Sequence, residues 1–89
     1  MELEQLRIFA AVAESKSFTK AAKKLFISHS STSRAVKALE DELGVRLFER
    51  ENKIFGLTEK GKALYEGAKK LLSEAEELKK EIEENNIHK

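Results

Sequence analysis

No proline interrupts this chain of 89 residues, and glycine occurs only four times. Proline and glycine are the residues that most disfavour a helix interior, so their scarcity predicts a mostly α-helical fold. A chain of this length forms one small domain, which buries only roughly 60% of the surface that its unfolded state exposes. We therefore expect a small core built from helices.

Residue types that build catalytic and metal sites are absent or scattered. The sequence has no cysteine, which excludes disulfides, thiolate metal sites and a cysteine nucleophile. His29 and His88 have no partners at ligand spacing, and the serines beside His29 lack a base held in place by a third group. We therefore expect no enzyme, no cofactor, no metal and no small-molecule site. Because no apolar run approaches the roughly 20 residues of a membrane span, we expect no membrane association. The absence of cysteine fits a reducing compartment, so we expect a cytoplasmic protein.

Apolar residues recur at helical spacing in four segments. The predicted helices cover residues 2–14, 18–25, 29–43 and 59–86. Each of the last three follows a residue whose hydroxyl can cap a helix, and these are Ser17, Ser28 and Thr58. Gly44 follows the third helix at the position where a left-handed residue commonly ends one. Two short extended runs, residues 45–48 and 54–57, predict a two-stranded hairpin before the last helix.

Positive charge gathers in the middle of the chain, although the whole chain has a net charge of only +1. No acidic residue lies between Glu14 and Glu40, and that stretch contains the basic residues Lys16, Lys20, Lys23, Lys24, Arg34 and Lys37. Such a stretch indicates a surface for a polyanion, and a solvated helix face is the ordinary alternative.

The third predicted helix has a small, polar and basic outer face. Its inward face is predicted to hold Thr32, Val36, Leu39 and Leu43. At 100° per residue, the opposite face then holds Ser30, Arg34, Lys37 and Asp41, with Ser33 at its flank. Ala22 is the small residue where the second and third helices cross, and Leu25, Ile27 and Val36 form their shared core. A helix that enters the major groove of DNA needs such a face, whereas the alternative is an amphipathic helix in a helical bundle.

The sequence resembles the DNA-binding region of LysR-type transcriptional regulators. The shorter matches are Leu6, Phe9, Val12, Ser17, Phe18, Thr19, Ala21, Ala22, Leu25, Ser28, Ser33, Arg34, Leu57, Thr58 and Gly61. The most specific match is the run from Leu39 to Arg50, which reads LEDELGVRLFER. The resemblance implies a winged helix-turn-helix in residues 1–58, with a small two-stranded wing, and a long linker and dimerisation helix in residues 59–89.

Three departures from the family pattern affect the interpretation. The third helix starts with Ser28-His29-Ser30-Ser31-Thr32, where family members commonly have serine, glutamine, proline, alanine and an aliphatic residue, so the family's base preference does not carry over. The wing lacks the usual glycine, and Lys53 stands where an arginine often reaches the minor groove. The chain ends at Lys89 without the family's effector domain, either as a fragment or as a short natural regulator.

We expect the DNA contacts to come from the start of the second helix, the third helix and the wing. The expected contact residues are Ser17, Thr19, His29, Ser30, Ser33, Arg34, Lys37, Arg50 and Lys53. Thr19 and the backbone near Ser17 would touch phosphate, and Arg50 and Lys53 would meet the DNA backbone or minor groove.

The last predicted helix carries a heptad stripe. Its members are Leu64, Ala68, Leu71, Ala75, Leu78 and Ile82. A helix of about 42 Å is too long to fold wholly onto so small a domain, which is the alternative interpretation. We expect the stripe to form a homodimer seam, and Tyr65 and Leu72 to pack beside it on the chain's own first helix. The resemblance adds that the two helices run antiparallel.

These observations predict a regulator of transcription that binds an inverted repeat in double-stranded DNA as a homodimer, of the bacterial or archaeal nucleoid-associated type. The alternative is an interaction module, which would pair through the last helix with a full-length regulator and bind DNA only incidentally.

Overall fold

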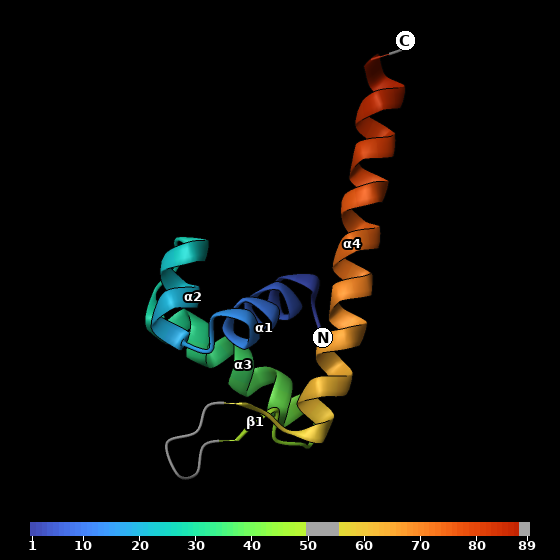
Figure 1. Cartoon of the computed structure of the whole chain (residues 1–89). Coiled ribbons are helices and arrows are strands. Elements are labelled where there is room, and N and C mark those ends of the chain that lie inside the picture. Colours follow the sequence, from blue (N-terminus) through green and yellow to red (C-terminus); the bar gives the residue numbers. More distant parts are fainter. Residues whose placement is uncertain (50–55, 88–89) are drawn as a thin grey trace.

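The computed structural model describes residues 1–49 and 56–87 (Figure 1). The elements follow the chain in the order α1 (Leu3–Ser15), α2 (Phe18–Leu25), α3 (His29–Leu43), β1 (Phe48–Glu49), β2 (Gly56–Leu57) and α4 (Glu59–Ile87). The predicted fold class is confirmed: the described residues form four helices and a two-stranded hairpin. The bounds of α2 and α3 are those predicted, whereas each strand has only two residues. Arg50, Lys53 and the first two residues of the second predicted extended run lie outside the described residues.

The predicted caps set the helix ends. The backbone N–H groups of Lys20, Ser31 and Gly61 donate to the hydroxyls of Ser17, Ser28 and Thr58 at 3.1, 3.0 and 3.0 Å. These bonds satisfy donors that the first turn of a helix leaves free. At the other end of α3, Gly44 adopts a φ of 68°, so the left-handed ending predicted there is confirmed.

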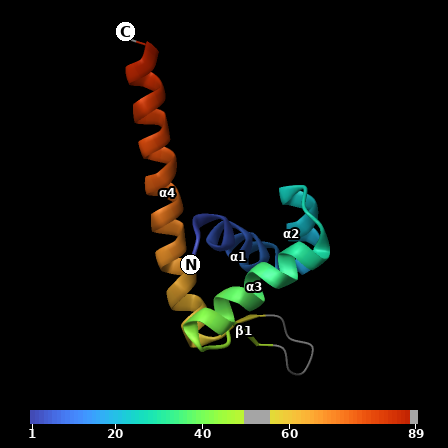
Figure 2. The ribbon, with the colours of Figure 1, turned by 180° about the vertical axis from the view of Figure 1, so that it is seen from behind.

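The core lies where α1 packs against the other three helices. Phe9 and Val12 of α1 and Val36 and Leu39 of α3 are fully buried. Phe48 of β1 joins them, with its ring centroid 5.4 Å from that of Phe9. Figure 2 shows α3 running from α2 to the foot of α4. Helices α1 to α3 and the hairpin form the end of the molecule that is called the head below, and the buried side of α3 holds this end together.

Leu43, which was predicted to face inward, is exposed, and so is Leu3 of α1. Leu43 is 40% exposed because it is the last residue of α3, and the chain turns away at Gly44 before another element can cover it. Leu3 is 46% exposed because it is the first residue of α1. Thr32 is fully buried, and its hydroxyl donates to the carbonyl of Ser28 at 2.9 Å, so burial leaves no polar atom of this side chain unpaired.

The hairpin is attached to the foot of α4. β1 and β2 are antiparallel, with Phe48 opposite Leu57 and Glu49 opposite Gly56. The N–H of Thr58 donates to the carbonyl of Leu47 at 3.0 Å. Gly61 lies so close to that carbonyl that a Cβ at position 61 would collide with it, so only glycine permits this approach. The start of α4 therefore holds the entry to β1 in place.

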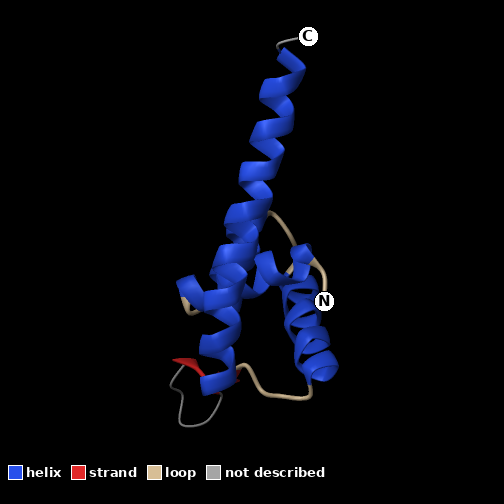
Figure 3. Cartoon of the chain, turned by 90° about the vertical axis from the view of Figure 1, so that its right-hand side faces the viewer, coloured by secondary structure: helices blue, strands red, loops and turns tan. Residues whose placement is uncertain are grey.

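Most of α4 extends away from the head (Figure 3). The helix has 29 residues, and the molecule measures 56 × 25 × 19 Å. Its first turns pack on α1: Leu64 and Tyr65 are partly buried against the core, and Ala68 is only 1% exposed. In the described part of the chain, no helix is long and apolar enough to cross a membrane.

Candidate nucleic-acid interface

A tight turn of three residues joins α2 to α3. Phe26 ends α2 with a φ of 59°, and the N–H of Ile27 donates to the carbonyl of Ala22 at 3.0 Å. Ala21 and Ala22 are buried, and their small side chains let the two helices cross closely. Val36 is fully buried, as predicted for the shared core, while Leu25 and Ile27 are only partly buried. The turn and the packing together fix the direction in which α3 projects.

The outer face of α3 is exposed as predicted. Ser30, Arg34, Lys37 and Asp41 are all exposed, and Ser33 at the flank is half-buried. The serines at the start of the helix bond to one another, since the hydroxyl of Ser28 donates to that of Ser31 at 2.9 Å. Arg34 reaches back toward this group, with one guanidinium nitrogen 3.5 Å from the Ser31 hydroxyl. The N-terminal end of α3 therefore presents short polar groups and one cation.

His29 lies at the first position of α3 and is exposed. Its ring centroid is 6.2 Å from that of Phe18, and Phe18 in turn lies 5.9 Å from the core residue Phe48. A row of aromatic rings thus runs from the core to the imidazole, so the position of His29 is restrained on one side. Its exposed nitrogen atoms can donate to or accept from a ligand in front of the helix.

The start of α2 offers a second polar end beside α3. Thr19 is exposed, whereas Ser17 is half-buried and its hydroxyl already accepts from Lys20. The Ser17 side chain is therefore engaged within the helix, and the free groups at this end are the Thr19 hydroxyl and backbone N–H groups of the first turn. A helix N-terminus of this kind suits an anion such as phosphate.

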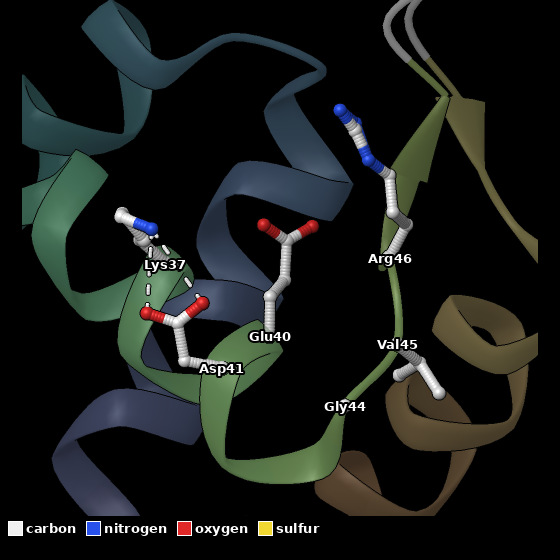
Figure 4. Close-up of a pocket in the computed structure, with 6 residues that line it drawn as sticks. All are labelled: Lys37, Glu40, Asp41, Gly44, Val45 and Arg46. Atoms are coloured by element: carbon white, nitrogen blue, oxygen red, sulfur yellow. Dashed lines mark hydrogen bonds and ion pairs between the residues drawn. The ribbon is translucent and has the colours of Figure 1, made fainter.

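An open hollow of about 480 Å³ separates α3 from the chain that enters β1 (Figure 4). Lys37 and Asp41 line one side of the hollow, the carboxylate of Glu40 points into it, and Arg46 lines the other side. The amine of Lys37 is 3.3 Å from the nearest carboxylate oxygen of Asp41. The Glu40 carboxylate accepts from the backbone N–H of Leu47 at 2.9 Å. Arg46 was not among the predicted contact residues, because it belongs to no predicted helix face.

The remaining residues that were predicted to make contacts either lie on α4, away from this surface, or are not among the described residues. Arg50 and Lys53 are not among the described residues. On α4, Leu71, Leu78 and Ile82 are 45, 60 and 53% exposed, and Ala75 is partly buried. Ala68 was expected at the dimer seam, but it is buried within its own chain, and Leu64 is partly buried against the same core. Among the described residues, no group of three or more histidine, aspartate and glutamate side chains could hold a metal ion.

The helix-turn-helix, the hairpin and the exposed basic face of α3 define a DNA-binding domain of the winged helix-turn-helix class. The chain belongs to the bacterial regulatory helix-turn-helix proteins of the lysR family, whose sequence profile matches residues 3–62. The resemblance found in the sequence is therefore confirmed.

Curated relatives are longer transcriptional regulators. The chain is 47% identical over 75 residues to a probable RuBisCO transcriptional regulator of Trieres chinensis, covering 84% of this chain and 24% of that protein. It is 46% identical over 78 residues to the regulator BenM of Acinetobacter baylyi, covering 88% of this chain and 26% of BenM. The chain thus spans about a quarter of the length of these relatives.

Solved structures with the same fold include domains bound to DNA. The DNA-binding domain of BenM in complex with its catB site 1 matches with a TM-score of 0.89 and 43% identity, covering 94% of this chain and 93% of that one. The CbnR domain in a DNA complex matches with a TM-score of 0.86 and 38% identity, covering 96% and 98%. At these identities the similarity extends beyond the fold to the family.

Proposed function

We propose that this chain binds double-stranded DNA sequence-specifically as a homodimer and thereby regulates transcription. The observation that carries the proposal is the outer face of α3, whose exposed first half is polar and basic. Its acids Glu40, Asp41 and Glu42 lie in the last turn, beyond that half. The BenM and CbnR domains, which share this fold, were solved in complex with DNA, and this supports DNA binding by the chain.

In this proposal α3 enters the major groove by its N-terminal half. His29, Ser30 and Ser33 are short enough to approach base edges, and Arg34 stands mid-face, where a guanidinium can bind guanine or a phosphate bidentately. Lys37 lies one turn further and would meet the DNA backbone. The restrained ring of His29 and the bonded serines reduce the entropy that is lost when the tip of the helix docks.

Two further elements would hold the domain on the duplex. The exposed Thr19 and the backbone N–H groups at the start of α2 would bind one phosphate. The hairpin of β1 and β2 would approach the neighbouring minor groove, and we assign Arg50 and Lys53 to contacts there. Such contacts set the register on DNA, whereas the side chains of α3 supply the preference for particular bases.

The exposed stripe on α4 supports pairing of two chains. Leu71, Leu78 and Ile82 extend beyond the head, where the rest of the described chain leaves them in water. They recur at heptad spacing, and the partly buried Ala75 between them allows close approach of a second helix. An antiparallel pair of such helices would separate two reading heads. Heads about 34–36 Å apart fit half-sites one turn of DNA apart, as an inverted repeat.

The same stripe supports one rival, in which α4 pairs with a full-length relative and DNA affinity is incidental. Selection from a random DNA library with the purified chain alone separates the two functions. The proposal predicts enrichment of an inverted repeat. It also predicts that the logarithm of the affinity falls linearly with the logarithm of the salt concentration, with a slope of about −0.9 per neutralised phosphate. Recovery of no sequence, or an affinity that is flat between low and physiological salt, would contradict it.

A further inference from the structure

We propose that Arg46 binds the DNA sugar–phosphate backbone that passes between α3 and the β1–β2 hairpin. The inference rests on the proposed function, in which α3 occupies a major groove and the hairpin approaches the minor groove beside it. One sugar–phosphate backbone separates any two neighbouring grooves of a duplex. A domain that occupies both grooves straddles that backbone, so the segment joining its helix to its hairpin faces the phosphates.

Arg46 lies in the middle of that joining segment. α3 ends at Leu43 and β1 begins at Phe48, and the exposed Arg46 side chain extends along the approach to β1 toward the hairpin (Figure 4). In the described part of the chain, its guanidinium has no hydrogen bond or ion pair. A guanidinium presents a planar fork of donors that matches two phosphate oxygens at once.

The backbone that carries Arg46 is held on both sides. Its carbonyl accepts from the hydroxyl of Thr58 at 2.6 Å, and the next N–H, that of Leu47, donates to Glu40 at 2.9 Å. The backbone beside Arg46 is thus held by the start of α4 and by α3, while the Arg46 side chain remains available to bind a ligand. A charged group on a fixed backbone loses less freedom on binding than one on a mobile loop.

The neighbouring charges leave Arg46 as the available cation of the hollow. Lys37 is paired with Asp41, and the half-buried Glu40 accepts a backbone N–H, so both acids already have partners. Glu40 is the carboxylate that faces Arg46 across the hollow, and it is less exposed than Arg46. A phosphate that arrives at the open side would therefore meet the guanidinium before the carboxylate.

The test compares Arg46→Gln with Lys70→Gln, which removes one positive charge from an exposed position on α4. On the DNA selected by the wild-type chain, Arg46→Gln should weaken binding about tenfold per subunit and lower the salt slope by about 1 per subunit, with the base preference unchanged. Lys70→Gln should change neither quantity, and Arg46→Lys should retain most of the slope. Thermal unfolding followed by circular dichroism checks that each variant is folded.

Uncharged phosphates locate the contact. Replacing single phosphates between the half-site and the adjacent minor groove by methylphosphonates should weaken wild-type binding at one position and leave Arg46→Gln unaffected there. An unchanged affinity and slope for Arg46→Gln, or an altered base preference, would overturn the assignment while leaving the proposed function intact. A wild-type chain that selects no DNA contradicts the proposed function, and the assignment of Arg46 fails with it.

Discussion

Lys37 and Asp41 form an ion pair across one turn of α3, with the lysine amine 3.3 Å from the nearest carboxylate oxygen. Both side chains are well exposed, at 74% and 67%. Such a pair contributes little to stability, typically less than about 1 kcal/mol. Its consequence is for binding: the last cation on the reading face is held by an acid of the same helix, and DNA must replace that acid as its partner.

Asp41→Asn should therefore tighten DNA binding. The substitution frees Lys37 and removes one negative charge beside the phosphates, and the loss of an exposed pair should change the free energy of unfolding by less than about 1 kcal/mol. Titration of the selected DNA by fluorescence anisotropy measures the affinity. Glu83→Gln, at an exposed position near the end of α4, is the charge-matched control and should have no effect. Equal affinities for Asp41→Asn and the wild type would show that the pair does not compete with DNA.

Arg34 and Lys53 should differ in what their loss does to base preference. Arg34 stands mid-face on α3 with its guanidinium near the tip of the helix, 3.5 Å from the Ser31 hydroxyl. If it reads a base, Arg34→Ala should cost about 1–3 kcal/mol of binding and relax the preference at one position. Lys53→Ala should instead weaken all sequences evenly, as the loss of a backbone contact does. Repeated library selection with each variant measures both effects, and a preference changed by Lys53→Ala alone would reverse the assignments.

Local signals in the sequence predicted the local structure well, and tertiary contacts account for the differences. The ends of α2 and α3 follow from Ser17, Ser28 and Gly44, because a cap acts within one turn of its own residue. The heptad stripe correctly marks the apolar face of α4, but heptad spacing does not distinguish a partner chain from α1. Ala68 was therefore assigned to a seam although its own chain buries it.

The candidate DNA-binding surface likewise has one part that the sequence predicts and one part that depends on tertiary contacts. The exposed positions of α3 follow from helical periodicity, and the Lys37–Asp41 pair has the i,i+4 spacing that sequence can reveal. Arg46 carries no such signal, since its location depends on how the end of α3, the hairpin and Thr58 are brought together. Helical periodicity in the sequence therefore does not predict contacts made by the segments that join helices to strands.

Tyr65 should make the attachment of α4 to α1 sensitive to alkaline pH. Its hydroxyl donates to the Glu14 carboxylate at 2.9 Å, and its pKa is raised above 10.0 by burial first, then by that hydrogen bond and by the charges of Glu14 and Glu66. A raised pKa means that the folded state holds the proton more tightly than the unfolded state. The stabilisation is therefore complete below pH 10 and lost as the pH rises through the folded pKa.

Tyr65→Phe should accordingly lower the free energy of unfolding by at most about 1 kcal/mol at neutral pH. The difference from the wild type should close above about pH 10, and lysine titration cancels because both chains share it. Urea unfolding at neutral pH and above about pH 10 measures the difference in the free energy of unfolding between the two chains. The ultraviolet absorbance of the single tyrosine reports its ionisation directly. A difference that does not vary with pH would mean that the hydrogen bond is not its source.

Leu71→Lys should abolish the proposed dimer without unfolding the head. Leu71 is 45% exposed in the single chain, so the substitution leaves the core intact, yet it would place a charge at the centre of the seam. A buried charge without a partner costs several kcal/mol, and a two-helix seam of this size cannot absorb that loss. Sedimentation should show a dimer for the wild type at micromolar concentration and a monomer for the variant, which should also lose cooperative binding to two half-sites. Ser73→Lys adds the same charge at an exposed position off the heptad stripe and should remain dimeric. A monomeric wild type, or a dimeric Leu71→Lys variant, would show that the exposed stripe of α4 is not where two chains meet.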